Sequence, residues 1–159
     1  MNVLATEYSP YTKSFDIFLA GCAAPHCPGC FNPESWDFDQ GDACNKGFLQ
    51  KILTKIHEFD LLIDNVIVMG GEPLDHEETE LLELLWELKK QTRKAMWMFT
   101  KYEFDQIPEP VKEVCDYIKC GRYDQTQPAE ENVQYGVPLA SANQRVYHHG
   151  TDYVCRVVE

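Results

Sequence analysis

The sequence predicts an α/β fold: a single domain, residues 1–159, built as an open, incomplete (β/α) barrel with a mainly parallel sheet. Short apolar runs that fit strands alternate with stretches in which apolar residues recur at helical spacing. This order is typical of parallel α/β sheets. The chain has 159 residues, whereas a closed eightfold barrel needs about 250. At about 30 residues for each strand–helix unit, the chain provides roughly five units and leaves the barrel open.

The first half of the chain provides two expected strands and one helix. Residues 1–14 carry no strong pattern, and the first strand is expected at 15–20. A long loop rich in Gly, Pro, Asn and Asp then runs to Cys44, and loops of this length are usually functional. The run at 66–69 is apolar throughout, as a strand buried on both faces is. A helix is expected at 45–59, where one face gathers the apolar residues Leu49, Ile52, Leu53 and Ile56.

The second half of the chain continues the alternation. A helix is expected at 77–90, with acidic residues in its first turn and lysines in its last, as the helix dipole favours. Its apolar face consists of Leu81, Leu84, Leu85 and Leu88. After it we expect a strand at 95–100, a short helix at 108–115 and a strand at 116–120. An irregular segment at 121–140 and a final strand at 153–158 follow.

Charge and cysteine content restrict function and location. Asp and Glu number 26 against 14 Lys and Arg, a net charge of −12, which opposes binding to nucleic acid and to anionic membranes. No apolar run reaches the length of a membrane span, and the first residues, MNVLATEYSPYTK, lack the apolar core of a signal peptide. Seven cysteines in such a chain favour metal ligands and free thiols over disulfides. We therefore expect a cytoplasmic protein that binds neither nucleic acid nor membranes.

Three of the seven cysteines, Cys22, Cys27 and Cys30, form a C-x4-C-x2-C motif after the first expected strand. Pro28 and Gly29 predict a tight turn that points the last two sulfurs the same way. A structural zinc and the common iron–sulfur clusters take four protein ligands. Three thiols would leave one iron of a 4Fe-4S cluster open for chemistry. From spacing alone, a zinc site completed by a histidine or a distant cysteine is the alternative.

A second motif, Gly70-Gly71-Glu72-Pro73, directly follows the second expected strand. Two glycines there let a ligand approach the backbone without interference from a Cβ atom. Glu72 adds a carboxylate that could orient an ammonium group. A tight strand–helix turn would have the same sequence, so the motif gains its weight from following the cysteine motif by one strand–helix unit.

Residues 27–36 read C-P-G-C-F-N-P-E-S-W. They resemble the C-P-G-C-[YF]-N-x-x-[ST]-W signature of the activating proteins of anaerobic ribonucleotide reductases, which are small radical S-adenosylmethionine (SAM) enzymes. The family pattern is C-x3-C-x2-C, so this chain has one residue more in the first gap. The match after Cys27 favours an insertion among residues 23–26, with Cys27 rather than His26 as the ligand.

This resemblance implies a radical SAM domain in which Cys22, Cys27 and Cys30 hold a 4Fe-4S cluster. The amino and carboxylate groups of SAM would chelate the fourth iron, and the reduced cluster would cleave SAM to a 5′-deoxyadenosyl radical. The implied substrate is a glycine Cα–H of the partner, an anaerobic ribonucleotide reductase. The implied one-electron donor is a protein such as flavodoxin or ferredoxin.

The resemblance also implies which residues contact SAM. Gly70, Gly71 and Glu72 would lie at its amino group. Gly29 and Phe31 flank the third cysteine and would lie against SAM, although Phe31 fits an ordinary core residue equally well.

Two further stretches resemble the family. Thr100-Lys101-Tyr102 stands where the family often has T-G-Y, so that Lys101 replaces a glycine. Residues 141–145, S-A-N-Q-R, resemble an S-x-N-Q-R stretch near the family's carboxyl end. Thr100, Asn143 and Arg145 thereby join the residues expected at SAM. Arg145 could pair with a carboxylate of SAM or of the partner, or could form an ordinary surface ion pair.

Two other functions fit the same residues. One is another small radical SAM enzyme, similar to 7-carboxy-7-deazaguanine synthase, that acts on a small molecule. The other is a non-catalytic interaction module stabilised by zinc. A pyruvate formate-lyase activator fits less well, because those proteins usually have a longer chain. The remaining cysteines are interpreted as plain thiols rather than as a second metal site: Cys44, Cys115, Cys120 and Cys155.

Overall fold

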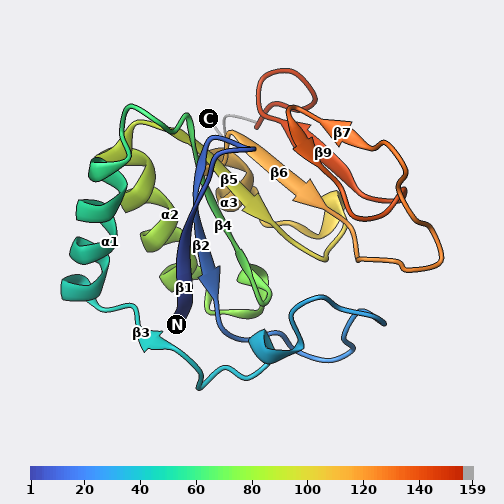
Figure 1. Cartoon of the computed structure of the whole chain (residues 1–159), viewed down its shortest axis with the longest axis horizontal. Helices are drawn as coiled ribbons and strands as arrows, with labels where there is room; N and C mark the ends of the chain where they lie inside the picture. Colours follow the sequence, from blue (N-terminus) through green and yellow to red (C-terminus); the bar gives the residue numbers. More distant parts are fainter. Residues whose placement is uncertain (156–159) are drawn as a thin grey trace.

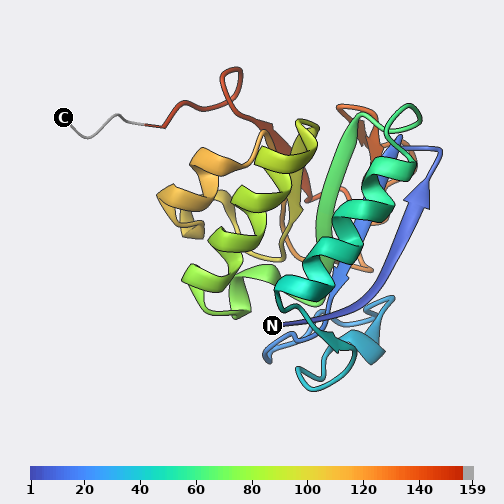
Figure 2. The ribbon, with the colours of Figure 1, turned by 90° about the vertical axis from the view of Figure 1, so that its left-hand side faces the viewer.

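A computed structural model describes residues 1–155, and their main feature is a seven-stranded sheet in the order β3-β1-β2-β4-β5-β6-β9. Within these residues the three α-helices lie on one face of the sheet (Figures 1 and 2). The sheet ends at β3 on one side and at β9 on the other and does not close on itself. The expected open α/β fold is therefore confirmed.

Four parallel strands form the centre of the sheet: β2 (Ser14–Leu19), β4 (Asn65–Gly70), β5 (Ala95–Phe99) and β6 (Tyr117–Cys120). Their connections contain α1 (Lys46–Glu58), α2 (Glu78–Thr92) and α3 (Glu109–Val114). All seven elements lie within two residues of the bounds expected from the sequence. The expected number of strand–helix units was too high, because both ends of the described chain form antiparallel strands instead.

The antiparallel strands lie at the two edges of the sheet. β1 (Asn2–Ser9) pairs with β2, and the two-residue β3 (Asp42–Ala43) pairs with β1. β9 (Arg145–His148) pairs with β6 on the other side. The strand expected at 153–158 is not found where it can be described: Tyr153 forms only an isolated bridge with His149, and residues 156–159 lie outside the described part.

Local sequence explains where the helices begin and end. The side chain of Asn45 caps α1 by accepting a hydrogen bond from the backbone N–H of Phe48 at 2.9 Å. α2 ends at Thr92, because the next residue, Arg93, has a left-handed backbone with a φ of 56°. The described residues also form three short 3-10 helices, η1 (Pro33–Ser35), η2 (Pro73–Asp75) and η3 (Phe104–Gln106). None of the helices described combines the length and the apolar character that a bilayer span requires.

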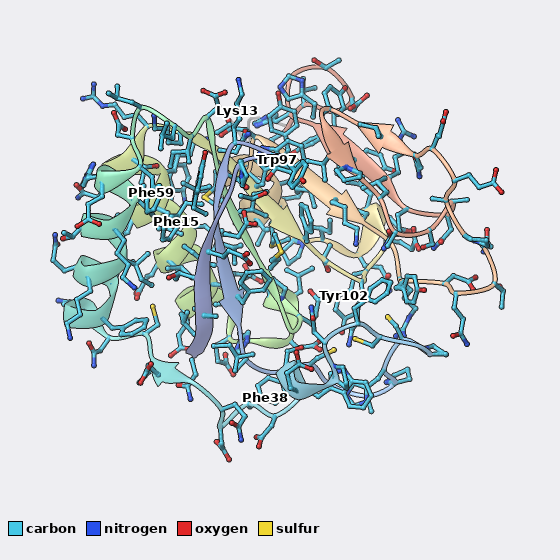
Figure 3. The ribbon with its side chains drawn as sticks, viewed as in Figure 1. Lys13, Phe15, Phe38, Phe59, Trp97 and Tyr102 are labelled. Carbon is cyan, nitrogen blue, oxygen red and sulfur yellow. The ribbon has the colours of Figure 1, made fainter. Side chains whose placement is uncertain are left out.

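Two apolar cores lie on opposite faces of the sheet, because successive strand residues point to opposite sides. The larger core lies between the sheet and the helices, and it contains Phe15 with Phe59 packed beside it (Figure 3). The smaller core, on the other face, joins strand residues to the segment after β6 and consists of Ile67, Trp97, Val137, Leu139 and Val146.

Residues 121–144, which we call the covering segment, pack on this second face. The sequence predicted an irregular segment here, but the structure adds a short hairpin of β7 (Val133–Gln134) and β8 (Val137–Pro138). The covering segment therefore occupies the face of the sheet opposite the helices, and it ends at β9, whose first residue pairs with Cys120 at the carboxyl end of β6.

Candidate functional site

A cleft of about 260 Å³ lies where the four parallel strands end. Because parallel strands all point the same way, the loops that follow β2, β4, β5 and β6 meet at this edge. The cleft is lined by the three cysteines of the motif, by Met69 to Glu72 at the end of β4, by Phe99 to Lys101 at the end of β5, and by Lys119. The covering segment lines the remaining side with Pro138, Leu139, Ala140 and Gln144.

Cys22, Cys27 and Cys30 all line this cleft, and all three are half-buried free thiols. A tight turn joins the last two, with the backbone N–H of Cys30 donating to the carbonyl of Cys27 at 3.1 Å. Gly29 has a φ of 74° in this turn, a conformation that favours glycine. Burial raises the pKa of the Cys22 thiol, and the nearby ammonium of Lys101 partly opposes that rise.

His26, the rival ligand in the enlarged gap, points elsewhere. Its ring stacks on Trp36 with centroids 3.8 Å apart. Its Nε2 lies 2.8 Å from the backbone oxygen of Cys22, to which it can donate. His26 is absent from the cleft lining, whereas Cys27 is part of it. The geometry thus supports the alignment that keeps Cys27 as the second thiol.

The donor set fits a 4Fe-4S cluster. Thiolates are the usual ligands of such clusters, and three of them around one cleft would leave one iron without a protein ligand. Across residues 1–155, no three His, Cys, Asp or Glu side chains come together closely enough to hold a single metal ion.

The glycine motif after β4 packs directly against the start of the cysteine loop, which we define as residues 21–44. The N–H of Gly71 donates to Leu19 at 2.8 Å, and the N–H of Glu72 donates to the carbonyl of Gly21 at 2.7 Å. A Cβ atom added to Gly71 would overlap the backbone of Gly21. Gly71 therefore allows a close approach of the two loop backbones, and both Gly70 and Gly71 line the cleft.

Glu72 joins the ends of β4 and β5. Only 1% of the residue is exposed, and its Oε1 accepts hydrogen bonds from the backbone of Leu74 at 3.0 Å and from the hydroxyl of Thr100 at 2.7 Å. Its Oε2 accepts from the N–H of Lys101 at 2.7 Å. Burial raises the pKa of this carboxyl group. Glu72 and Thr100, expected separately at the site, are thus direct partners.

Three of the expected SAM contacts lie off the cleft lining. Gly29 faces the side chain of Gln125. Asn143 donates to the backbone of Arg122 at 2.9 Å. Arg145 lies over the ring of Tyr147 and has its Nη2 3.8 Å from Asp152, so the structure shows the surface ion pair for it. The side chain in that stretch that does line the cleft is Gln144, between the two residues the sequence indicated.

Phe31 lines the cleft, but it is 70% exposed and not a core residue. Its ring lies 4.7 Å from the ring of Tyr123 in the covering segment. A second contact links the same two regions, since Arg122 donates to the carbonyl of Pro25 at 2.9 Å. The covering segment and the cysteine loop therefore meet at one rim of the cleft.

Lys119 is a cleft residue that sequence reasoning missed. Its neighbours Ile118 and Cys120 belong to the core under the helices, so strand alternation turns Lys119 to the cleft. Burial lowers the pKa of its ammonium group, and within residues 1–155 it takes part in none of the ion pairs. A lysine inside an otherwise apolar strand was the signal that could have found it.

Comparison with known proteins agrees with this geometry. The chain is 25% identical over 137 residues to the anaerobic ribonucleoside-triphosphate reductase-activating protein of Escherichia coli K12, and 26% identical to the protein of the same name from Salmonella typhimurium. Each comparison covers 83% of this chain and 86% of the relative. Residues 13–147 match the family described as the 4Fe-4S single cluster domain. That match contains both loops that bring their motifs to the cleft, and the chain belongs to the 4Fe-4S single cluster domain family.

Proposed function

We propose that the protein is a radical SAM activase that cleaves SAM reductively at a 4Fe-4S cluster and generates a glycyl radical on an anaerobic ribonucleotide reductase. The observation that carries this proposal is the meeting of Cys22, Cys27 and Cys30 with the Gly70–Glu72 loop around one cleft. The names of the relatives point to the same reductase.

Each part of the cleft has a role in this proposal. The three thiolates hold the cluster, which when bound and reduced supplies the electron that cleaves SAM to methionine and a 5′-deoxyadenosyl radical. Glu72 uses three hydrogen-bond acceptor sites within the protein. An ionised carboxylate has about four, so one remains for the amino group of SAM. Lys119 adds a positive charge that attracts the SAM carboxylate.

The partner and the location follow from the same proposal. The substrate is a glycine-containing loop of the reductase, and Phe31 and Tyr123 at the rim of the cleft offer it aromatic contacts. The electron comes from a one-electron donor such as flavodoxin or ferredoxin. The activity belongs in a reducing cytoplasm, where free thiols persist.

The first test is an EPR spectrum of the chain reconstituted anaerobically with iron and sulfide and then reduced, recorded with and without SAM. We expect a reduced 4Fe-4S signal that changes when SAM is added, because SAM binds the iron that lacks a protein ligand. An EPR signal that does not change when SAM is added contradicts the proposed chemistry. Zinc without labile sulfide in the purified protein would contradict the proposal and favour the alternative function, a non-catalytic interaction module stabilised by zinc.

A second test separates a protein substrate from a small-molecule substrate. With a reductase whose glycine residues carry deuterium, we expect deuterium to enter 5′-deoxyadenosine. Rapid SAM-dependent turnover of a small molecule without any reductase polypeptide would contradict the activase assignment.

A further inference from the structure

Two features that set this sequence apart from the family signature touch each other in the structure. One is the additional residue between Cys22 and Cys27, and the other is Lys101 in place of a glycine after β5. The Nζ atom of Lys101 lies 2.7 Å from the backbone oxygen of Ala23, inside the enlarged gap. It also lies 3.5 Å from the sulfur of Cys22.

Asp75 completes the arrangement from the loop after β4. Its Oδ2 lies 3.0 Å from the ammonium of Lys101 and accepts the N–H of Ala23 at 2.7 Å. The hydroxyl of Tyr102, which is labelled in Figure 3, donates to the other carboxylate oxygen at 2.5 Å. Both backbone polar groups of Ala23 are therefore held by this one ion pair.

The pair is buried, with side-chain exposures of 7% for Lys101 and 6% for Asp75. Surface ion pairs contribute little to stability, but a buried pair whose remaining donors and acceptors are satisfied holds its surroundings in one geometry. Here those surroundings are the first residues of the cysteine loop. The cluster ligand Cys22 and its neighbour Ala23 are thus fixed by two other loops, those after β4 and after β5.

The contact with sulfur has a further effect. Hydrogen bonds to ligand sulfurs and nearby positive charge stabilise the more negative, reduced form of an iron–sulfur cluster and so raise its reduction potential. We propose that Lys101 is a positioning residue that anchors the enlarged gap and donates to the Cys22 sulfur, making the cluster easier to reduce. This inference rests on the proposed function, because it takes Cys22 to be a cluster ligand.

The test is an EPR-monitored redox titration of the full chain, reconstituted anaerobically and without SAM. Lys101→Met should shift the midpoint potential to more negative values, because it removes the donor and the positive charge. Asp75→Asn should shift it to more positive values, because the lysine then lacks its counter-charge. The double variant should lie between Lys101→Met and the wild type. Lys94→Met, which removes a lysine paired with Asp60 at the opposite end of β5, is the charge control and should leave the potential unchanged.

A second readout needs no cluster. In the apo-protein, amide exchange at Ala23 should be faster in Lys101→Met than in Lys94→Met by about tenfold, as expected when a charge-assisted contact that orders the loop is lost. Should Lys101→Met lose the cluster altogether, the double variant, which leaves no unpaired carboxylate, supplies the potential. Loss of the cluster from Lys101→Met and from the double variant, but not from Lys94→Met, also supports the proposal that Lys101 anchors the enlarged gap.

The outcomes distinguish the inference from the proposed function. An unchanged potential in Lys101→Met together with unchanged exchange at Ala23 overturns the inference and leaves the activase intact. A wild-type chain that takes up no 4Fe-4S cluster overturns the proposed function, and the redox effect of Lys101 falls with it.

Discussion

At the scale of single residues, the choice between Cys27 and His26 decides how the enlarged gap is interpreted. The sequence favoured Cys27 because the signature matches from that residue onward. The structure places Cys27 on the cleft and stacks His26 on Trp36. Substitution of Cys27 and substitution of His26 should therefore have opposite effects on cluster binding.

Cys27→Ala should abolish cluster binding and SAM cleavage, because two thiols no longer make a three-point site. His26→Ala should keep both and lose about 1 kcal/mol of stability from the stacking contact. Iron and sulfide per chain and the yield of 5′-deoxyadenosine measure the difference. Loss of activity in the histidine variant with activity kept in the cysteine variant would reverse the assignment.

Asp16 on β2 is a buried carboxyl group whose effect on stability the sequence did not indicate. It is 8% exposed, accepts a hydrogen bond from the hydroxyl of Ser14 at 2.6 Å and stands opposite Glu7 on β1. Burial raises the pKa of its carboxyl group from 3.8 to about 6, with Glu7 adding to the rise. A carboxyl whose pKa is higher in the folded than in the unfolded chain weakens the fold as pH rises between these values, and the penalty is complete above them.

Asp16→Asn should therefore stabilise the apo-protein at pH 8 by on the order of 1 to 2 kcal/mol and bring no such gain near pH 4. Urea unfolding at both pH values measures the effect. Asp39→Asn, on an exposed loop, is the matched control and should change the free energy of unfolding at neither pH. Equal gains at both pH values would show that charge burial is not the cause.

At the scale of elements, the parallel strands and helices were predictable because each carries its own pattern. α1 and α2 have apolar faces of buried residues at helical spacing, and β4 and β5 are buried on both faces. β1 lacked a signal because only Val3 is fully buried in it. The hairpin of the covering segment was missed because its strands have two residues each and depend on the sheet beneath them.

The contact between the loop after β4 and the cysteine loop was also not evident from the sequence. Gly71 was expected to leave space for a ligand, yet its nearest neighbour is the backbone of Gly21. Backbone cannot move aside as the end of a flexible side chain can, so an added methyl group must push the two loops apart.

Gly71→Ala should therefore destabilise the apo-protein by about 1 to 3 kcal/mol, the usual cost of overpacking, and lower cluster uptake. Gly47→Ala, in the first turn of α1 and with only ordinary contacts, is the control and should be neutral or stabilising by up to about 1 kcal/mol. Chemical unfolding and iron content measure both. A Gly71 variant as stable as the wild type would contradict the close approach of the loops.

At the scale of the whole molecule, the cleft depends on parts that are far apart in sequence. The motifs at Cys22–Cys30 and Gly70–Glu72 were found because each is local. Lys119, Leu139 and Gln144 join them only through the order of strands in the sheet and the path of the covering segment. Short patterns therefore predicted the two motifs that meet at the cleft, whereas the residues on its far side follow only from the fold.

Burial separates the three cleft cysteines from Cys115 and Cys120, and the two sets should differ in their sensitivity to air; Cys44 and Cys155, which lie apart from the cleft, are half-exposed as well. The three cleft thiols are half-exposed and close enough in sequence to oxidise one another when no metal protects them. Cys115 and Cys120 are buried, and burial raises the pKa of both thiols, to about 12 for Cys120, which suppresses the reactive thiolate. Maleimide labelling of the apo-protein should therefore modify the cleft cysteines before Cys115 and Cys120, and brief aeration should remove the reactive cleft thiols before it touches that buried pair. Protein isolated in air would then keep its fold and lose its capacity for iron until a reductant restores the three thiols.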